Sequence, residues 1–311
     1  MKILVWHQGA LGDLLLAGPA LTAVSRHYAG AGLVGVGNPG LWRLLAKTLP
    51  LTAVWDGGEG VWSGLFLEQG VLPPRLKERL AGIDLALVFS PRTRPGFLAR
   101  LVQGGVAQCF WIPSFPQGGS DHVAAVQARR LGELGVRTEP RPFRLRLQPG
   151  TGEELGFSPE DRILALGPGS GSSAKNWPLS HYYEVARTLA FDAGLKVVWL
   201  AGPAEATVLP YLEGLAEAQD QVVWANEPLE RVTRLLSRTQ VYLGGDSGLT
   251  HLAAAAGARR VVALFGPTDP RVWAPVGEEV TVLTPPAGAG PSAFLADLLP
   301  SSVLIVVKRL L

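Results

Sequence analysis

The sequence predicts an α/β protein made of two doubly wound domains, each a parallel sheet covered by helices. Short apolar runs typical of buried strands alternate with helical segments through most of the 311 residues. A chain of that length accommodates two domains of ordinary size. The alternation is interrupted over residues 137–159, where Arg, Pro, Gly and Glu accumulate, so we place the domain boundary after residue 150.

The first domain, residues 1–150, opens with a predicted strand over residues 2–6 and a glycine-containing turn over residues 8–13. An apolar helix is predicted over residues 14–28, with Pro19 in its early part. The other predicted elements are strands at 33–37, 51–55 and 84–89 and a helix at 41–49. Because strands alternate with helices, we expect the strands to run parallel and to be joined by crossovers.

The second domain, residues 151–299, repeats this alternation. Strands are predicted at residues 162–166, 196–200, 221–224, 241–243 and 261–265, and helices at 180–193, 229–237 and 249–256. The tail, residues 300–311, has the pattern of a further helix. Since ligands of parallel sheets bind beyond the carboxyl ends of the strands, the turns after these strands are expected to line a site.

The glycine-rich turn over residues 244–248 is the most informative of these turns. It leads into an Ala-rich helix that begins near Leu249 and ends at Gly257. A helix N-terminus after such a turn presents free N–H groups and the positive end of the helix dipole, which suits a phosphate. Ordinary packing of a strand, a turn and a helix accounts for the same residues equally well.

A second turn, residues 167–178, combines glycines and serines with the cation of Lys175. Backbone and hydroxyl donors beside a positive charge favour a phosphate site, although a lysine on a turn is most often simply solvated. In the first domain, Asp13 opens a helix, where an aspartate is most often an N-cap. A carboxylate at the carboxyl edge of a sheet is also well placed to act as a general base.

The sequence lacks the motifs that identify several other classes of enzyme. The G-x-G-x-x-G match at residues 35–40 follows the second strand and contains Pro39, which disfavours a dinucleotide-binding oxidoreductase. The sequence contains neither a P-loop nor a G-x-S-x-G nucleophile elbow. The single cysteine, Cys109, excludes an internal disulfide, and the five histidines show no metal-ligand spacing.

Charge and hydropathy bear on partners and location. Residues 1–150 carry 16 Lys and Arg against 9 Asp and Glu, so this half is basic, whereas the remainder is acidic. A basic half favours an anionic glycolipid or a membrane surface as partner, and solvated arginines explain it as well; nucleic acid is disfavoured. Lys2 and the apolar run after it mimic a signal peptide, but His7, Gln8 and Asp13 interrupt the run, so we expect a cytoplasmic protein.

Four motifs together resemble glycosyltransferase family 9, which contains the ADP-heptose:lipopolysaccharide heptosyltransferases. They are Gly12-Asp13 followed by Pro19-Ala-Leu, Lys175-Asn-Trp-Pro178, Gly245-Asp-Ser-Gly-Leu-Thr-His251 and Gly266-Pro-Thr-Asp-Pro270. The resemblance extends in order along nearly the whole chain. It implies a GT-B fold, in which two Rossmann-like domains face a cleft, with the acceptor bound by the first domain and the donor by the second. It also implies that the helix at about residues 300–311 packs back on the first domain.

The resemblance assigns roles to individual residues. Asp13 matches the catalytic base, and Lys175 matches the residue that stabilises the donor diphosphate. Glu205 matches an acid facing the nucleoside of the donor, and Asp246 an acid facing the transferred sugar. The implied donor-binding residues are Gly12, Gly169, Ser170, Glu205, Asp246, Ser247, Gly248, Leu249, Thr250 and His251. Leu16, Ala17 and Gly18 replace residues that are partly polar in many members, which leaves the acceptor and the sugar open.

We therefore predict an inverting, metal-independent glycosyltransferase without a cofactor. Its donor is a nucleotide sugar, ADP-heptose first, and its acceptor an anionic glycolipid or polysaccharide, met at the inner face of the membrane. No Asp-x-Asp pair occurs, which disfavours the usual metal site of glycosyltransferases. Two alternatives stay open: a nucleotide-sugar epimerase of similar fold and a non-catalytic nucleotide-sugar binding protein.

Overall fold

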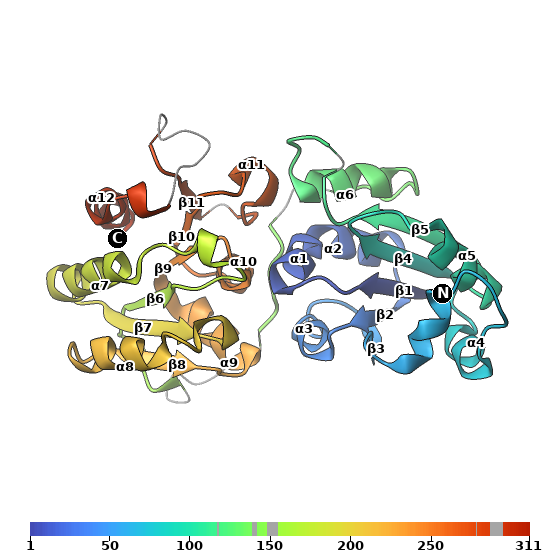
Figure 1. The fold of residues 1–311 in the computed structure, drawn as a ribbon, viewed down its shortest axis with the longest axis horizontal. Coiled ribbons are helices and arrows are strands. Elements are labelled where there is room, and N and C mark those ends of the chain that lie inside the picture. Colours follow the sequence, from blue (N-terminus) through green and yellow to red (C-terminus); the bar gives the residue numbers. More distant parts are fainter. Residues whose placement is uncertain (117, 139–141, 148–154, 278, 287–294) are drawn as a thin grey trace. The chain divides into compact units, whose positions relative to one another are not determined.

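The structure is a computed structural model that describes residues 1–116, 118–138, 142–147, 155–277, 279–286 and 295–311. Its contacts divide the chain into two compact units, residues 1–145 and 146–311 (Figure 1). The division falls close to the predicted boundary after residue 150, which itself lies outside the described residues. Each unit contains one parallel sheet, as the sequence predicts.

The sheet of the first unit has the strand order β3-β2-β1-β4-β5. The strands are β1 (Lys2–His7), β2 (Gly32–Gly37), β3 (Leu51–Asp56), β4 (Leu85–Ser90) and β5 (Gln108–Pro113). β1 lies in the middle and pairs with β2 on one side and with β4 on the other, so that Val5 lies between Gly35 and Leu87. The winding therefore reverses direction at the junction of β1 and β4.

In the described residues of this unit, six α-helices and a short 3-10 helix surround the sheet. They are α1 (Leu11–Leu16), α2 (Gly18–His27), α3 (Pro39–Leu44), η1 (Gly60–Leu65), α4 (Pro74–Leu80), α5 (Pro95–Gln103) and α6 (Val123–Gly132). On one face, η1, α4 and α5 bury an apolar cluster that includes Trp6, Trp62 and Phe97. The Trp6 ring meets the other two edge-on, at centroid distances of 5.4 and 4.9 Å. These aromatic rings fix the position of the carboxyl end of β1.

The helix predicted over residues 14–28 is wrong as a single element, because the structure has two helices there, α1 and α2. Pro19 lies in the first turn of α2, where its missing N–H costs nothing. Gly18 lies against the ring of Phe143, and a Cβ atom at this position would come within 2.2 Å of that ring. Gly18 thus allows Phe143 to pack on the junction between the two helices.

The second unit repeats the winding of the first with one more strand, in the order β11-β10-β9-β6-β7-β8. The strands are β6 (Ile163–Gly167), β7 (Lys196–Ala201), β8 (Val222–Ala225), β9 (Thr239–Gly245), β10 (Val261–Leu264) and β11 (Val280–Leu283). Its winding reverses between β6 and β9, which are adjacent, with Gly167 opposite Gly244. The two units therefore place their switch points at equivalent strands.

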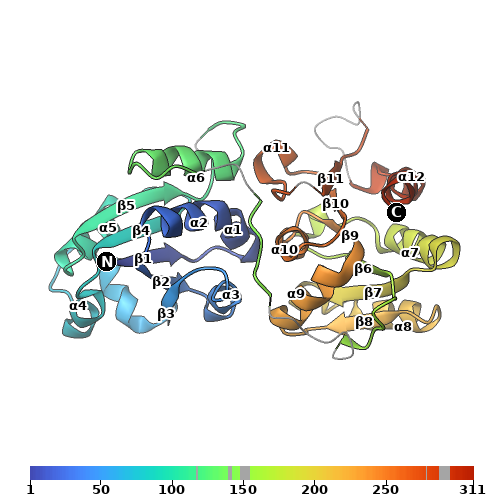
Figure 2. The same ribbon diagram turned by 180° about the vertical axis from the view of Figure 1, so that it is seen from behind.

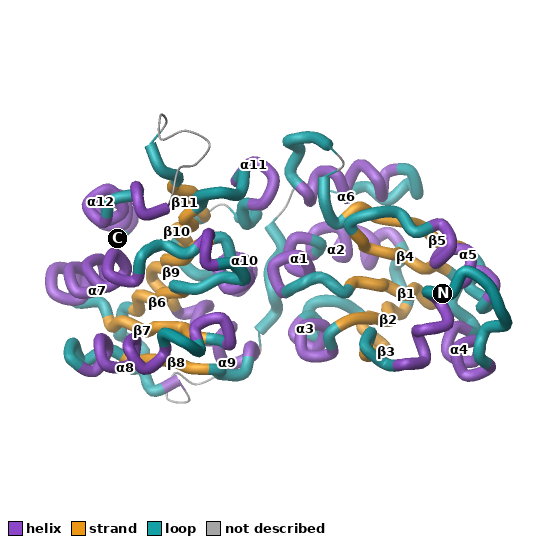
Figure 3. The backbone as a smooth tube through the Cα atoms, in the orientation of Figure 1, coloured by secondary structure: helices purple, strands orange, loops and turns teal. Residues whose placement is uncertain are grey.

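Helices cover both faces of this second sheet. They are α7 (Leu179–Ala193), α8 (Leu209–Glu217), α9 (Leu229–Arg238), α10 (Gly248–Ala256), α11 (Pro270–Trp273) and α12 (Pro300–Leu310). Figures 2 and 3 show α7 and α8 on one side of the strands and α9 and α10 on the other. None of the helices in the described part of the chain is long and apolar enough to cross a membrane.

The C-terminal helix α12 belongs to the second unit, whereas its expected packing on the first domain stays a prediction. Val303 and Val307 are fully buried in the apolar cluster that α7 contributes to. Lys308 at the end of α12 forms an ion pair of 2.6 Å with Asp192 of α7. The two buried valines of α12 are therefore covered by other residues of the second unit.

Candidate functional site

Most of the predicted site residues follow the strands that flank the switch point of each sheet, whereas Glu205 follows β7. In the first unit, Asp13 lies beyond the carboxyl end of β1. In the second unit, Lys175 lies beyond β6 and Asp246 beyond the neighbouring strand β9. Ligands of doubly wound sheets bind at such switch points, so the fold positions both sets of residues for binding.

Asp13 is the third residue of α1, and Ala10 is the N-cap residue of that helix. Asp13 Oδ2 accepts a hydrogen bond of 3.0 Å from the Ala10 N–H, as an acidic residue at this position does in a capping box. The interpretation of Asp13 as the N-cap itself is therefore wrong. Gly12 precedes it in the same turn, and the Asp13 carboxylate lies at the wall of a cavity.

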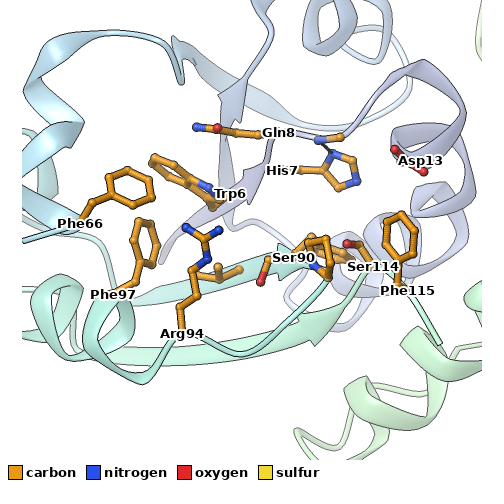
Figure 4. Close-up of a pocket in the computed structure, with 14 residues that line it drawn as sticks. Trp6, His7, Gln8, Asp13, Phe66, Ser90, Arg94, Phe97, Ser114 and Phe115 are labelled. Carbon is orange, nitrogen blue, oxygen red and sulfur yellow. Dashed lines mark hydrogen bonds between the residues drawn. The ribbon is translucent and has the colours of Figure 1, made fainter. Parts of the chain in front are cut away.

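The cavity beside Asp13 has a volume of ≈ 200 Å³ and lies at the carboxyl ends of β1, β4 and β5 (Figure 4). Its aromatic wall is formed by Trp6, Phe66, Phe89, Phe97 and Phe115. Its polar lining is formed by His7, Gln8, Asp13, Ser90, Arg94 and Ser114. An aromatic wall with a few converging polar groups is typical of a site for a small molecule.

Of these polar residues only Asp13 is predicted from the sequence, and His7 and Arg94 are the two ionisable ones that the sequence did not indicate. His7 is buried, and burial lowers its pKa to about 4, against an opposing contribution from the nearby Asp13 backbone. Arg94 is exposed, and its guanidinium lies over the Phe66 ring, 5.8 Å from the centroid. Their place in the sequence, directly at or after the ends of β1 and β4, is the signal that could have identified them.

In the second unit the turns after β6, β9 and β10 meet at one carboxylate. Lys175 Nζ lies 2.7 Å from Asp246 Oδ2. The Thr268 hydroxyl donates a hydrogen bond of 2.8 Å to the same oxygen. Asp246 thus brings together residues from all three turns and orients the Lys175 ammonium group. Thr268 was not predicted as a site residue, although the motif that contains it was recognised.

Glu205 is a buried carboxylate that lies against the glycine turn after β6. Its Oε2 atom accepts a hydrogen bond of 2.5 Å from the Gly202 N–H. Its other oxygen, Oε1, would be 1.4 Å from a Cβ atom at Gly169, so only glycine fits there without displacing the carboxylate. The adjacent Ser170 hydroxyl lies 2.8 Å from Asn176 Oδ1 and stabilises the turn. Glu205, Gly169 and Ser170 are therefore one structural group.

Helix α10 begins at the turn after β9 with Ser247 as its N-cap residue. The Ser247 hydroxyl caps no backbone N–H and lies 3.3 Å from the hydroxyl of Thr250. Within the described residues, the N–H groups of Gly248 and Leu249 have no protein acceptor. Free donors at the start of a helix, together with its dipole, suit an anion.

Below this turn, buried hydroxyl groups hold the backbone in place. Thr250 is buried and donates a hydrogen bond to the Gly245 carbonyl, and its hydroxyl also contacts the hydroxyl of Tyr242. Burial raises the pKa of Tyr242 to about 12, so this hydroxyl stays protonated. His251 is buried as well. Thr250 thus supports the turn from inside the fold, whereas Gly248 and Leu249 supply its free donors.

The structure brings together the predicted donor-binding residues of the second unit, while Asp13 and Gly12 lie in the first. Among the described residues, no three His, Cys, Asp or Glu side chains gather in a way that could hold a metal ion. What the second unit offers to an anion is one lysine and the free N–H groups of a helix start. What the first unit offers is a carboxylate beside an aromatic cavity.

Comparison with protein families and relatives identifies similar sequences. Residues 132–294, just over half of the chain, match the model of glycosyltransferase family 9 (heptosyltransferase). Lipopolysaccharide heptosyltransferase 2 of Escherichia coli K12 is 31% identical over 139 residues, which cover 43% of this chain and 39% of that protein. Lipopolysaccharide heptosyltransferase 1 of the same strain is 33% identical over 114 residues, 36% of this chain and 34% of that protein. The matched stretch thus spans well under half the length of these relatives.

Solved structures of similar fold cover the whole chain. The E. coli ADP-heptose lipopolysaccharide heptosyltransferase II has a TM-score of 0.79 and 22% identity, covering 100% of this chain and 98% of that one. The E. coli heptosyltransferase WaaC with ADP has a TM-score of 0.74 and 18% identity, covering 100% of both chains. At these identities the likeness concerns the fold, which is that of the GT-B heptosyltransferases.

Proposed function

Because this chain belongs to glycosyltransferase family 9, we propose that it transfers heptose from ADP-heptose to a sugar of a lipopolysaccharide-type glycolipid. The observation that carries this proposal is the group of Lys175, Asp246 and Thr268 beside the free N–H groups of α10. It provides positive charge and donors at the switch point of a Rossmann-like unit, as a diphosphate requires. A relative of the same fold was solved with ADP, which fits this choice of donor.

The leaving group of the transfer is a nucleoside diphosphate, on which negative charge develops. Fixed cations and N–H donors aimed at that charge stabilise the transition state. We assign this role to Lys175 and to the N–H groups of Gly248 and Leu249, without a metal ion. Asp246 uses one oxygen to orient Lys175 and leaves the other for a hydroxyl of the transferred sugar. Ser247 and His251 belong to the same helix start and are assigned to the diphosphate.

The nucleoside is assigned to the turn after β6. Glu205 is held against Gly169 by the Gly202 N–H, and a buried carboxylate in such a turn is suited to accept hydrogen bonds from ribose hydroxyls. Ser170 and its neighbours shape the same turn. The first unit contributes Gly12, which precedes Asp13 in the same turn and is assigned to the transferred sugar of the donor, not to its ADP part.

Asp13 is proposed as the general base. The acceptor hydroxyl loses its proton to the Asp13 carboxylate as its oxygen forms a bond to the anomeric carbon, while the bond from that carbon to ADP breaks. Attack from the face opposite ADP inverts the anomeric configuration. The cavity beside Asp13 is the proposed acceptor site.

Since a lipopolysaccharide precursor is an anionic glycolipid, we propose that the protein works in the cytoplasm, at the inner face of the membrane, with its basic first half toward the lipid.

The test is a transfer assay with ADP-heptose and a deacylated lipopolysaccharide core oligosaccharide, run in excess EDTA. ADP release and a mass gain of one heptose on the oligosaccharide are the expected results. Lys175→Met is expected to lower turnover by about 10²–10³, because a group aimed at the developing charge is lost. The matched control is Lys196→Met, an exposed lysine of the same unit.

Three results of this assay would contradict the proposal. Activity that disappears in EDTA and returns with Mg²⁺ would show that a metal ion carries the leaving charge. Conversion of the donor sugar to its epimer without acceptor would identify an epimerase. Binding of ADP-heptose without turnover would identify a binding protein.

A further inference from the structure

His7 carries a buried polar atom that has no hydrogen-bond partner in the part of the chain that the structure describes. The side chain is only 2% exposed, at the carboxyl end of β1. Its Nδ1 atom accepts a hydrogen bond of 3.3 Å from the Gly9 N–H. Its Nε2 atom has no hydrogen-bond partner among the described residues. Buried polar groups are nearly always paired, so an unpaired one at a cavity indicates a ligand that pairs with it.

The chemical character of Nε2 follows from the contact that Nδ1 makes. A ring nitrogen that accepts a hydrogen bond carries no proton, so the neutral ring has its proton on Nε2. Burial keeps the ring neutral, since it lowers the pKa to about 4. The unpaired atom is therefore an N–H donor, and the group that satisfies it must be an acceptor of hydrogen bonds.

The place of the ring selects the ligand. His7 and Asp13 line the same cavity (Figure 4). Both side chains lie against Gly9. A Cβ atom at Gly9 would be 2.9 Å from both Asp13 Oδ2 and His7 Cε1. The ring thus lies directly beside the proposed general base. A molecule that places one hydroxyl at Asp13 can therefore place another of its oxygen atoms beside the His7 ring.

We propose that His7 donates a hydrogen bond from Nε2–H to an oxygen of the acceptor sugar, next to the hydroxyl that Asp13 deprotonates. This inference rests on the proposed function and names a residue that positions the acceptor. The ligand is a polyhydroxylated sugar, whose hydroxyl and ring oxygens accept hydrogen bonds and whose apolar faces fit the aromatic wall. A cationic ligand is excluded at this atom, because it would face a donor.

Two variants separate the nitrogen atoms of the ring. His7→Gln places an amide N–H near the position of Nε2, whereas His7→Asn places its amide oxygen near Nδ1 and has no donor that reaches as far. In the transfer assay, His7→Asn is expected to raise KM for the core oligosaccharide about tenfold, with KM for ADP-heptose unchanged. His7→Gln is expected to stay within a few-fold of the wild type. A purely structural role for His7 predicts instead a lower Tm for both variants with KM for the oligosaccharide unchanged, and that result would overturn the proposal.

The wild-type protein provides a test that needs no variant. Long-range ¹H–¹⁵N spectra of the histidine rings at pH 7 are expected to show His7 as the Nε2–H tautomer. Its signals should shift when the core oligosaccharide is added and should stay in place when ADP is added. An Nδ1–H tautomer, or His7 signals that do not move in saturating oligosaccharide, would refute the inference. If the wild type transfers no heptose, the proposed function fails, and the response of His7 to the oligosaccharide still decides whether the cavity binds a sugar.

Discussion

At the scale of single residues, Asp13 combines a structural contact with a proposed chemical one. Asp13→Asn keeps an oxygen that accepts the hydrogen bond from the Ala10 N–H, so Tm and ADP affinity should barely change. The amide cannot take up a proton at neutral pH, and we expect turnover to fall by roughly 10²–10⁴. The measurement is Tm, ADP affinity and heptose transfer on the same preparation.

The control for Asp13→Asn is Asp84→Asn. Asp84 also accepts a backbone hydrogen bond, from the Lys2 N–H at 2.7 Å, but it does not line the cavity. Its replacement should leave transfer unchanged. Retention of transfer in Asp13→Asn within a few-fold of the wild type would mean that Asp13 only stabilises α1 and that another group acts as base.

Burial of His7 also predicts how stability depends on pH. The pKa of the folded state is about 4, below the ordinary value of 6.5, so the unfolded chain binds more protons between these values. The free energy of unfolding is therefore expected to fall as the pH drops from 6.5 towards 4. Above pH 6.5, His7 should not contribute to the pH dependence of the free energy of unfolding. The difference between the two pKa values corresponds to roughly 3 kcal/mol.

Urea denaturation at pH 7 and pH 4.5 measures this effect as a difference between variants. His7→Gln should lose less stability than the wild type between the two pH values, since its side chain does not titrate. His27→Gln, which replaces an exposed histidine of the same unit, should lose as much as the wild type. Equal losses in all three proteins would show that His7 is not buried as a neutral ring.

At the scale of elements, the sequence predicted the strands of both sheet centres and the turns that follow them. It missed the edge strands β5 and β11, which are only partly buried for much of their length, and in β11 Thr281 also interrupts the apolar residues. It also joined α1 and α2, because the packing of Phe143 on Gly18 is a tertiary contact without a local signal.

Some residues of the candidate site were predicted and others were missed, for a similar reason. The glycine turns and Lys175 have local patterns, and the structure places them at the switch point of the second sheet. Thr268 and His7 acquire their surroundings from segments distant in sequence. The hydrogen bond of Thr268 to Asp246 and the unpaired Nε2 of His7 therefore became visible only in three dimensions.

The turn after β6 offers a matched pair of glycines for a test. Gly169→Ala should displace Glu205, because the new Cβ atom would be 1.4 Å from Glu205 Oε1. Gly171 has no atom near the position of an added Cβ, so Gly171→Ala should have little effect. We expect Gly169→Ala to weaken ADP binding at least tenfold, the approximate loss when a charged hydrogen-bonding group moves out of place. Binding is measured by isothermal titration.

The double variant Gly169→Ala, Glu205→Ala distinguishes the two effects of that clash. Removal of the side chain gives the added methyl group room, so the Tm of the double variant should exceed that of Gly169→Ala. Its ADP affinity should stay low, because the carboxylate is absent. Recovery of full affinity in the double variant would show that Glu205 shapes the turn without contacting the nucleoside.

At the scale of the whole molecule, the chain uses the same winding twice. Each unit begins with its central strand and reverses direction next to it, so each presents its turns at a switch point. The two sets of turns differ in chemistry. The first unit carries a carboxylate and an aromatic cavity, and the second a lysine and a free helix start. In the proposed function, these two sets of turns divide acceptor binding and donor binding between the units.

This division predicts that ADP protects one unit only. A ligand that binds the folded state stabilises it by RT ln(1 + [L]/Kd), about 2.7 kcal/mol at a hundredfold excess over Kd. With ADP bound by the second unit, hydrogen exchange should slow at the turn 167–175, at Glu205 and at the start of α10. Exchange in β1 and α1 of the first unit should be unchanged. Exchange measured by mass spectrometry with and without ADP resolves these segments.

The same exchange experiment on Lys175→Met tests whether the protection at the start of α10 depends on the bound diphosphate. Without the lysine, ADP at the same concentration should give weaker protection at the start of α10, because the diphosphate loses the cation that holds it. Lys196→Met should show the protection of the wild type. If ADP protects residues 7–13 of the first unit and leaves α10 unchanged, the assignment of donor and acceptor to the two units is reversed. Asp13 would then have to be regarded as a nucleotide-binding residue.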